Sequence, residues 1–129
     1  AGWERGVLMA VRKTWCPDSR DMMWINCNPQ AGREMKDIHP LVVLSPKEFN
    51  QRTGIVIGLP MTTAAFNETN PFAVKFSGPK GAASYILGHQ PKSFDWRARN
   101  AKPHPWKKVP EESYALACET LNQIVEIGT

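Results

Sequence analysis

The sequence lacks the marks of several protein classes. It has only three cysteines, Cys16, Cys27 and Cys118, and no Cys-x-x-Cys or mixed cysteine–histidine spacing that could hold a metal ion. Isolated cysteines of this kind are typical of small apolar filler residues in the reduced environment of the cytoplasm. No apolar run approaches the roughly 18 residues needed to span a bilayer, and the N-terminal stretch has no apolar core of signal-peptide length. We therefore expect a cytoplasmic protein with no metal site, no cofactor and no membrane contact.

Internal repeats, low-complexity segments and alternating strand–helix units are also missing, which argues against a doubly wound sheet. The chain does have a series of short strand candidates, at 21–28, 41–46, 55–60, 72–76 and 83–90. A short helix is expected over 47–54, and an amphipathic helix over 111–128 follows the strands. This order predicts a mainly β fold, a small β-barrel with a C-terminal helix packed on it, in a single domain.

Glycine and proline set the expected boundaries of these elements. Gly54 is expected to end the short helix and Gly128 the last one, whereas Pro60 is expected to end the strand that begins at Ile55. The runs LVVLSP and IVIGLP are continuously apolar, so both are expected to be buried on two faces. Within the single domain 1–129, we assign residues 1–8 to an N-terminal extension and 20–127 to the barrel.

The stretch from 92 to 110 is the least regular part of the sequence. We expect 92–101 to begin extended and to turn helical around Trp96. Because 102–110 holds three prolines, we expect it to be a connector, with His104 exposed between two of them. The aromatic residues assigned to the core or, for the two tryptophans, to a subunit contact are Trp24, Trp96, Phe49 and Phe94.

Charge and loop length give the first indication of function. Lys and Arg number 16 against 12 Asp and Glu, a net charge of +4 that favours an anionic partner such as nucleic acid. The segment NPQAGREMKDIHP, residues 28–40, holds two prolines, one glycine and four charged residues. It is therefore a long loop, and long loops in compact domains are often functional.

Seven segments of the chain carry a resemblance to a known family: DMMWINCNP, GREMKDIHP, PLVVLSPKEFNQRTG, LPMTT, PFAVKF, GHQPKSFDWRAR and KVPEE. With these segments in order from about Asp21 to Ile127, the sequence resembles the MazF/PemK/Kid family of toxin ribonucleases. The resemblance implies a homodimeric, cytoplasmic SH3-like barrel that cuts single-stranded mRNA and so inhibits translation and growth. It also implies a cognate MazE/PemI-like antitoxin as partner.

The resemblance transfers to the candidate site position by position. The acid of the family's loop falls on Glu34, and the threonine after its second buried strand falls on Thr62. His39 stands where the family usually has arginine, and His89 where it often has aspartate. Arg20 replaces a glycine that commonly precedes the first strand.

Metal-free RNA cleavage explains why these residue types matter. The neighbouring 2′-hydroxyl attacks phosphorus, which requires a base, an acid for the leaving 5′-oxygen and donors for the phosphorane oxygens. Histidine can serve as acid or base near neutral pH, so we expect His39 and His89 to supply both roles in either order. Glu34 would orient one imidazole or help as base, and Thr62 would hold the phosphate. The alternatives are surface or capping histidines and a threonine that bonds its own turn.

Further residues are expected to contact RNA through charge or a hydroxyl group. They are Arg33, Lys36, Thr63, Lys92, Arg97 and Arg99, with Lys107 and Lys108 adding positive charge. Two other functions share this barrel: a CcdB-like toxin that binds a topoisomerase, and a catalytically inactive RNA-binding barrel. The loop glutamate together with Thr62 favours the ribonuclease.

Overall fold

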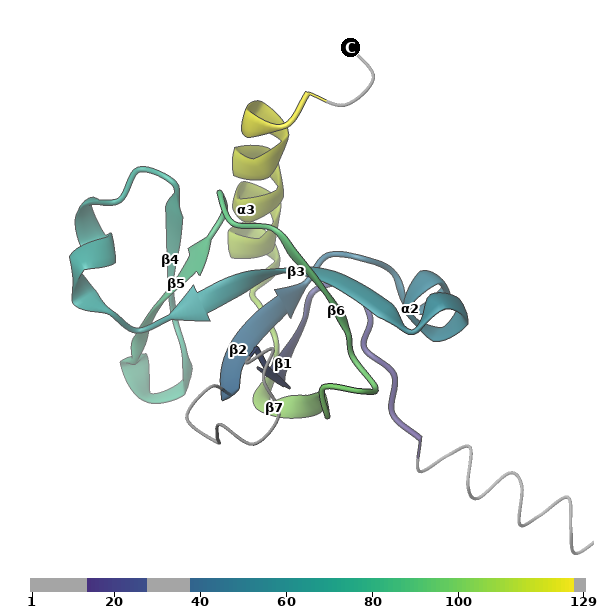
Figure 1. Cartoon of the computed structure of the whole chain (residues 1–129). Helices are drawn as coiled ribbons and strands as arrows, with labels where there is room; N and C mark the ends of the chain where they lie inside the picture. Colours follow the sequence, from purple (N-terminus) through teal and green to yellow (C-terminus); the bar gives the residue numbers. More distant parts are fainter. Residues whose placement is uncertain (1–13, 28–37, 127–129) are drawn as a thin grey trace, which may run out of the picture.

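A computed structural model describes residues 14–27 and 38–126 of the chain (Figure 1). In this part of the chain the elements are β1 (Asp21–Asn26), β2 (Ile38–Val43), α2 (Lys47–Thr53), β3 (Ile55–Thr62), the 3-10 turn η2 (Ala65–Thr69), β4 (Ala73–Ser77), the turn η3 (Pro79–Gly81), β5 (Ala83–Leu87), β6 (Lys92–Asp95), β7 (Lys102–Lys108) and α3 (Glu111–Ile124). The strands form one curled antiparallel sheet in the order β4-β5-β3-β2-β1-β7, with β6 on β3. The mainly β prediction is confirmed.

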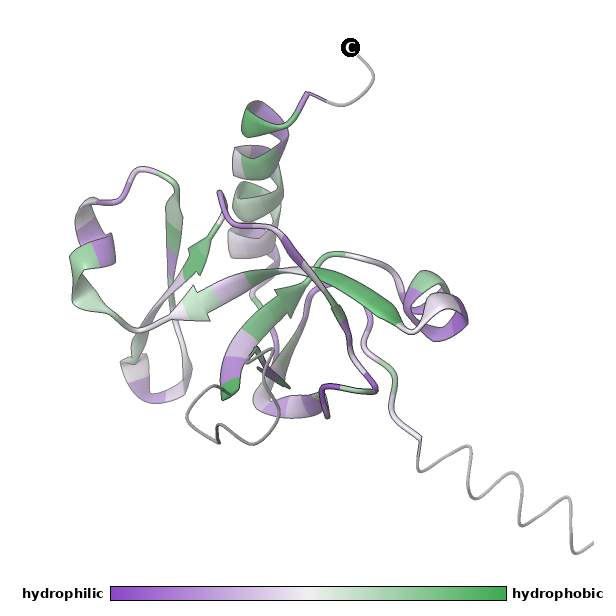
Figure 2. Cartoon of the chain, in the orientation of Figure 1, coloured by the Kyte–Doolittle hydropathy of each residue, from purple (hydrophilic) through white to green (hydrophobic). Residues whose placement is uncertain are grey.

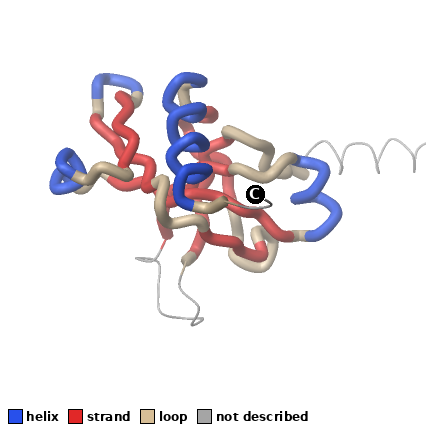
Figure 3. Tube along the Cα trace, turned by 90° about the horizontal axis from the view of Figure 1, so that it is seen from above, coloured by secondary structure: helices blue, strands red, loops and turns tan. Residues whose placement is uncertain are grey.

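The helices α2 and α3 lie at different places along this sheet. Figures 1 and 3 show α2 at one end of the molecule, the β4–β5 hairpin at the other, and α3 between them. The short helix ends as predicted, because Gly54 adopts a left-handed φ of 75° and its N–H donates to the Asn50 carbonyl. The last helix ends at Ile124, so the predicted end at Gly128 is wrong. Ile124 and Val125 are exposed, and Val125 has left the helical conformation for an extended one.

Two hydrophobic clusters lie on opposite faces of the central strands. Neighbouring residues alternate between them: Met22 and Val42 belong to one cluster, and Met23 and Val43 to the other. Figure 2 shows the later part of β2 and the first part of β3 as strongly hydrophobic. The prediction that the apolar run after Pro40 is buried on two faces is therefore confirmed. Each such side chain contributes about 1.5–3 kcal/mol of burial free energy.

Strand β3 does not end at Pro60, so that prediction is wrong. The strand continues to Thr62 because it changes partner at this point. β6 pairs with β3 as far as Gly58, and β5 begins to pair at Met61. Pro60 lies in the gap between these partners, where its missing N–H interrupts neither ladder on that edge. Ile57 is exposed on β3, so the prediction that the run IVIGLP is buried on two faces is wrong at that position.

The stretch from 92 to 110 agrees with prediction only at its start, which is extended as β6 (Lys92–Asp95). Residues 96–100 form turns, and the predicted connector contains strand β7. Within the described residues, β7 pairs on one edge only, with β1; Pro103 is opposite Met23 and the register has an irregularity. Proline is tolerated there because β7 is an edge strand.

The aromatic residues predicted for the core have mixed outcomes. Trp96 is buried as expected, and its Nε1–H donates to the Asn50 carbonyl at 2.8 Å. Phe94 is half-buried against the same cluster, and Trp24 is also half-buried. Phe49 is 38% exposed on α2, so its core assignment is wrong. The short helix α2 has seven residues, and the one that it buries is Asn50. The ring of the preceding residue, Phe49, therefore points away from the core.

Candidate active site

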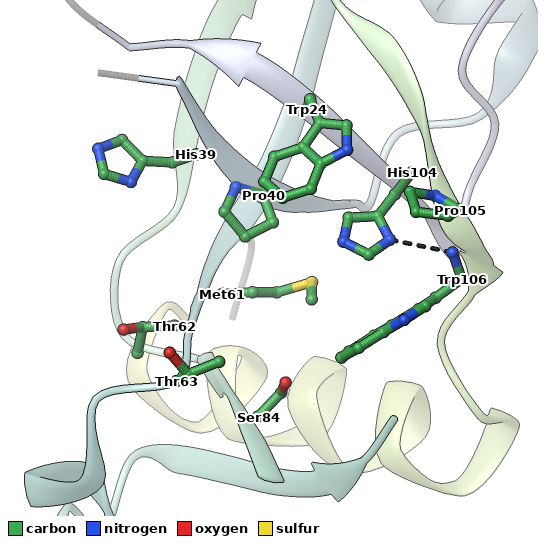
Figure 4. Close-up of a pocket in the computed structure, with 10 residues that line it drawn as sticks. All are labelled: Trp24, His39, Pro40, Met61, Thr62, Thr63, Ser84, His104, Pro105 and Trp106. Atoms are coloured by element: carbon green, nitrogen blue, oxygen red, sulfur yellow. Dashed lines mark hydrogen bonds between the residues drawn. The ribbon is translucent and has the colours of Figure 1, made fainter. Parts of the chain in front are cut away.

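A cavity of about 440 Å³ opens where β2 begins and β3 ends, beside β7 (Figure 4). Met61 lies in the middle of it and separates two ends of different chemistry. One end, here called the polar end, consists of His39, Thr62 and Thr63. The other, here called the aromatic end, contains Trp24, His104 and Trp106.

Strand pairing brings His39 and Thr62 to the polar end. β2 and β3 pair with Leu41 opposite Pro60, and continuing that register by two residues sets His39 opposite Thr62. Both side chains line the cavity, and His39 is exposed to solvent. Two residues distant in sequence therefore meet at one edge of the sheet.

Thr62 also makes the turn contact that the alternative interpretation predicts. Its hydroxyl oxygen accepts a hydrogen bond from the Ala64 N–H at 3.1 Å. A hydroxyl that accepts one bond still has its own hydrogen to donate. The turn therefore fixes the Thr62 side chain at the cavity and leaves its O–H available to an anionic ligand.

The aromatic end is built around a buried histidine. The His104 ring stacks on Trp24 with centroids 4.6 Å apart and meets Trp106 at 5.0 Å and 64°. Its Nδ1 accepts a hydrogen bond from the Trp106 backbone N–H at 3.0 Å. Burial lowers the pKa of His104 from its ordinary value of 6.5, so the ring is neutral at neutral pH. With Nδ1 as acceptor, Nε2 carries the ring hydrogen.

His104 is only 7% exposed, so the prediction of an exposed residue is wrong. Strand β7 turns alternate side chains inward, and His104 and Trp106 both fall on the inward side. The sequence does contain this signal, since the two residues alternate in KPHPWKK. The neighbouring prolines obscured it.

Trp106 joins the aromatic end to the β4–β5 hairpin. Its ring meets Phe76 edge-on, with centroids 6.2 Å apart and planes at 86°. Gly78 makes this possible, because a Cβ at that position would come within 2.3 Å of the Trp106 ring. The indole therefore occupies space that only glycine leaves open.

His89 lies outside this cavity. It follows β5, where its ring packs on Phe72 at 5.3 Å and contacts Gln90 at 3.2 Å. The chain turns at Gly88 and His89, between β5 and β6. Both of these strands pair with β3 on the edge opposite β2, which is the strand that carries His39. Within one chain, His39 and His89 do not share a site.

The other predicted site residues divide into two groups. Glu34, Arg33 and Lys36 lie outside the described residues. Lys92, Arg97 and Arg99 do not line the cavity.

The two arginines of the second group pack on their own aromatic neighbours. Arg97 lies 4.6 Å from the Trp96 ring centroid and donates to the Gln51 carbonyl. Arg99 lies 5.2 Å from the Phe94 ring centroid.

The described residues lack two further features. In 14–27 and 38–126, no three His, Cys, Asp or Glu side chains gather as metal ligands. In the same ranges, no helix has the length and apolar character needed to cross a membrane.

The arrangement combines proton transfer with flat apolar surface. An imidazole and two hydroxyls at the polar end can exchange protons and donate hydrogen bonds to an anion. The aromatic end offers ring faces and one ring N–H. Such a cavity suits a ligand that is anionic at one end and planar at the other.

Comparison with known proteins gives a consistent family assignment. The family model of the PemK-like, MazF-like toxin of type II toxin–antitoxin systems matches residues 18–125. The endoribonuclease toxin MazF of Escherichia coli (strain K12) is 39% identical over 87 residues, which cover 67% of this chain and 76% of that protein. The endoribonuclease PemK of Escherichia coli is 30% identical over 112 residues, covering 85% and 81% of the two chains.

A solved structure shares the fold. The crystal structure of MazE-MazF (Form-II) from Deinococcus radiodurans superposes with a TM-score of 0.73 at 25% identity, covering 89% of this chain and 100% of that one.

Proposed function

Because this chain belongs to the PemK-like, MazF-like toxin family of type II toxin–antitoxin systems, we propose that it is an endoribonuclease toxin that cuts single-stranded mRNA in the cytoplasm without a metal ion. Its relatives MazF and PemK are both named as endoribonucleases. The observation that carries the proposal is the meeting of His39 and Thr62 at one end of a cavity.

The reaction follows from the groups at the polar end. The 2′-hydroxyl of the nucleotide before the cut attacks phosphorus, and the P–O5′ bond breaks. The products are a 2′,3′-cyclic phosphate and a 5′-hydroxyl. His39 transfers a proton in this step as acid or base, and the Thr62 hydroxyl donates to a phosphorane oxygen.

A second proton-transfer group is needed, and two residues can supply it. Glu34 precedes His39 by five positions in the sequence. His89 lies outside the cavity of its own chain, so it fills this role only when a second copy of the chain brings it there. The proposal therefore includes a homodimer.

The proposed partner is a cognate antitoxin. A structural relative was crystallised as a MazE-MazF complex, and the net charge of +4 here favours an acidic segment. We expect such a segment to lie across the basic loop and to inhibit cleavage. Pull-down from the native host should recover a small acidic protein; recovery of no such protein would contradict this part of the proposal.

Cleavage in the presence of EDTA tests the proposed reaction. The purified protein should cut a mixed-sequence RNA and leave cyclic phosphate and 5′-hydroxyl ends. Thr62→Val should lower the rate by about 10²-fold, because a hydrogen-bond donor to the developing charge is lost. Thr69→Val is the matched control, since Thr69 is exposed and outside the cavity. Intact RNA, with a topoisomerase bound instead, would indicate the non-catalytic alternative.

A further inference from the structure

Two of the three aromatic-end residues lie outside the seven segments that carry the family resemblance. His104 and Trp106 lie in β7, between the matching segments GHQPKSFDWRAR and KVPEE. Neither residue has a role in the cleavage chemistry described above. Both nevertheless line the same cavity as Thr62.

His104 holds a hydrogen-bond donor in a fixed position. Trp24 stacks on one face of the ring, and the Trp106 N–H occupies Nδ1. The other ring nitrogen, Nε2, lies on the side that faces Pro40 and Met61 in Figure 4. In the part of the chain that the structure describes, no hydrogen bond to Nε2 is formed. Because the ring is held rigidly and lines the cavity, this donor is available to the acceptor of a ligand that enters there.

The surroundings of this donor restrict the class of ligand. Among the residues that the structure describes, no lysine or arginine lines the cavity, so the aromatic end does not suit a phosphate. An aliphatic side chain would leave the His104 donor unpaired, which costs free energy. A flat heterocycle with an acceptor on its edge satisfies both the apolar walls and the donor. A nucleobase has this combination.

We propose that the aromatic end binds one unpaired RNA base next to the cut phosphodiester, with an acceptor on the base edge bonded to His104 Nε2. The base would lie over Met61, beside the Trp106 ring. This rests on the proposed function, because the phosphate at Thr62 fixes which base can reach the pocket. One position of the RNA is then read by β7, and a base that cannot place an acceptor there binds less tightly.

Binding of RNA that cannot be cut tests the pocket separately from catalysis. Single-stranded 2′-fluoro oligonucleotides lack the attacking hydroxyl, and fluorescence anisotropy measures their affinity for the full chain. An abasic site moved through the oligonucleotide should weaken binding by about tenfold or more at one position, since one stacked base contributes roughly 1–3 kcal/mol. All four bases are then compared at that position.

Two variants separate the donor from the stacking surface. His104→Phe keeps a ring against Trp24 and removes the donor, so base preference should flatten at that position only. Trp106→Leu removes the stacking surface, so the abasic penalty itself should fall below about twofold. Circular dichroism checks that each variant is folded. If His104→Phe does not fold, a base analogue without the edge acceptor, offered to the unchanged protein, replaces it.

The outcomes distinguish the two proposals. Unchanged base preference in His104→Phe, an abasic penalty that survives in Trp106→Leu, or no sensitive position in the unchanged protein would overturn the base pocket. An acidic peptide that binds in a His104-dependent way, with no base preference, would assign the pocket to a protein partner and also overturn it. If base preference follows His104 but natural RNA is not cut in EDTA, the proposed catalysis fails and the pocket stands.

Discussion

The two ends of the cavity differ in exposure, origin and chemistry. The polar end has an exposed His39 and hydroxyls from the paired strands β2 and β3. The aromatic end has a buried His104 from the edge strand β7, held by stacking and a backbone hydrogen bond. On the proposals made above, the two histidines of this cavity would serve different purposes. An exposed imidazole can exchange protons with solvent and substrate, whereas a buried neutral one is a fixed donor.

The largest expected effect separates the two ends by chemistry. His39→Ala should lower cleavage by roughly 10²–10⁴-fold, as loss of a general acid or base typically does. Affinity for uncut RNA should change little. The control is Ile38→Ala, since Ile38 is exposed on the same strand and does not line the cavity. Near-normal cleavage by His39→Ala would remove the polar end from the mechanism.

The next effect tests whether a second chain completes the polar end. His89→Ala should lower cleavage by roughly 10²-fold. Mixing it with inactive His39→Ala should restore about a quarter of the activity, because half of the dimers are mixed and each rebuilds one of two sites. A near-normal rate for His89→Ala alone would assign the second proton transfer to Glu34.

A smaller effect is expected on stability at the aromatic end. Gly78→Ala places a methyl group within 2.3 Å of the Trp106 ring. Since the backbone φ of −80° is ordinary, the cost comes from overpacking and should be about 1–3 kcal/mol in the free energy of unfolding. Urea denaturation measures it. An unchanged midpoint would show that Trp106 moves freely and that the aromatic end is not preformed.

The smallest effect is a pH dependence of stability. Burial lowers the pKa of His104 in the folded state from its ordinary value of 6.5. The unfolded state therefore binds the proton first, so His104 should reduce stability as the pH falls below 6.5 towards the lower folded pKa. Above 6.5 this contribution is constant. Urea denaturation measures the free energy of unfolding at each pH. As the pH falls through that range, this free energy should decrease more steeply for the unchanged protein than for His104→Phe. The same pH dependence in both proteins would contradict a buried neutral ring.

The sequence predicted most of the fold where local pattern and burial agree. Apolar runs identified β2 and β3, and Gly54 correctly ended α2. Predictions failed where tertiary pairing overrides a local rule. Pro60 did not end β3, because the strand changes partner there. The prolines of β7 did not prevent a strand, because only one of its edges is paired.

The candidate site was predictable only in part, for a related reason. The family resemblance located His39 and Thr62, and strand pairing brings them together. It could not locate His104, because the direction of that side chain depends on which edge of β7 pairs with β1. The place of His89 outside the cavity depends on which edge of β3 pairs with β5 and β6, which the sequence does not specify.

The most direct test compares single-turnover cleavage at saturating RNA between His39→Ala and Trp106→Leu. It asks whether the chemistry belongs to the polar end of the cavity and base binding to the aromatic end. We predict that His39→Ala binds RNA normally and cuts it at least 10²-fold more slowly. Trp106→Leu should bind more weakly and cut at nearly the unchanged rate once saturated. If Trp106→Leu instead loses cleavage at saturation while His39→Ala keeps it, the assignment of chemistry to one end and base binding to the other is contradicted.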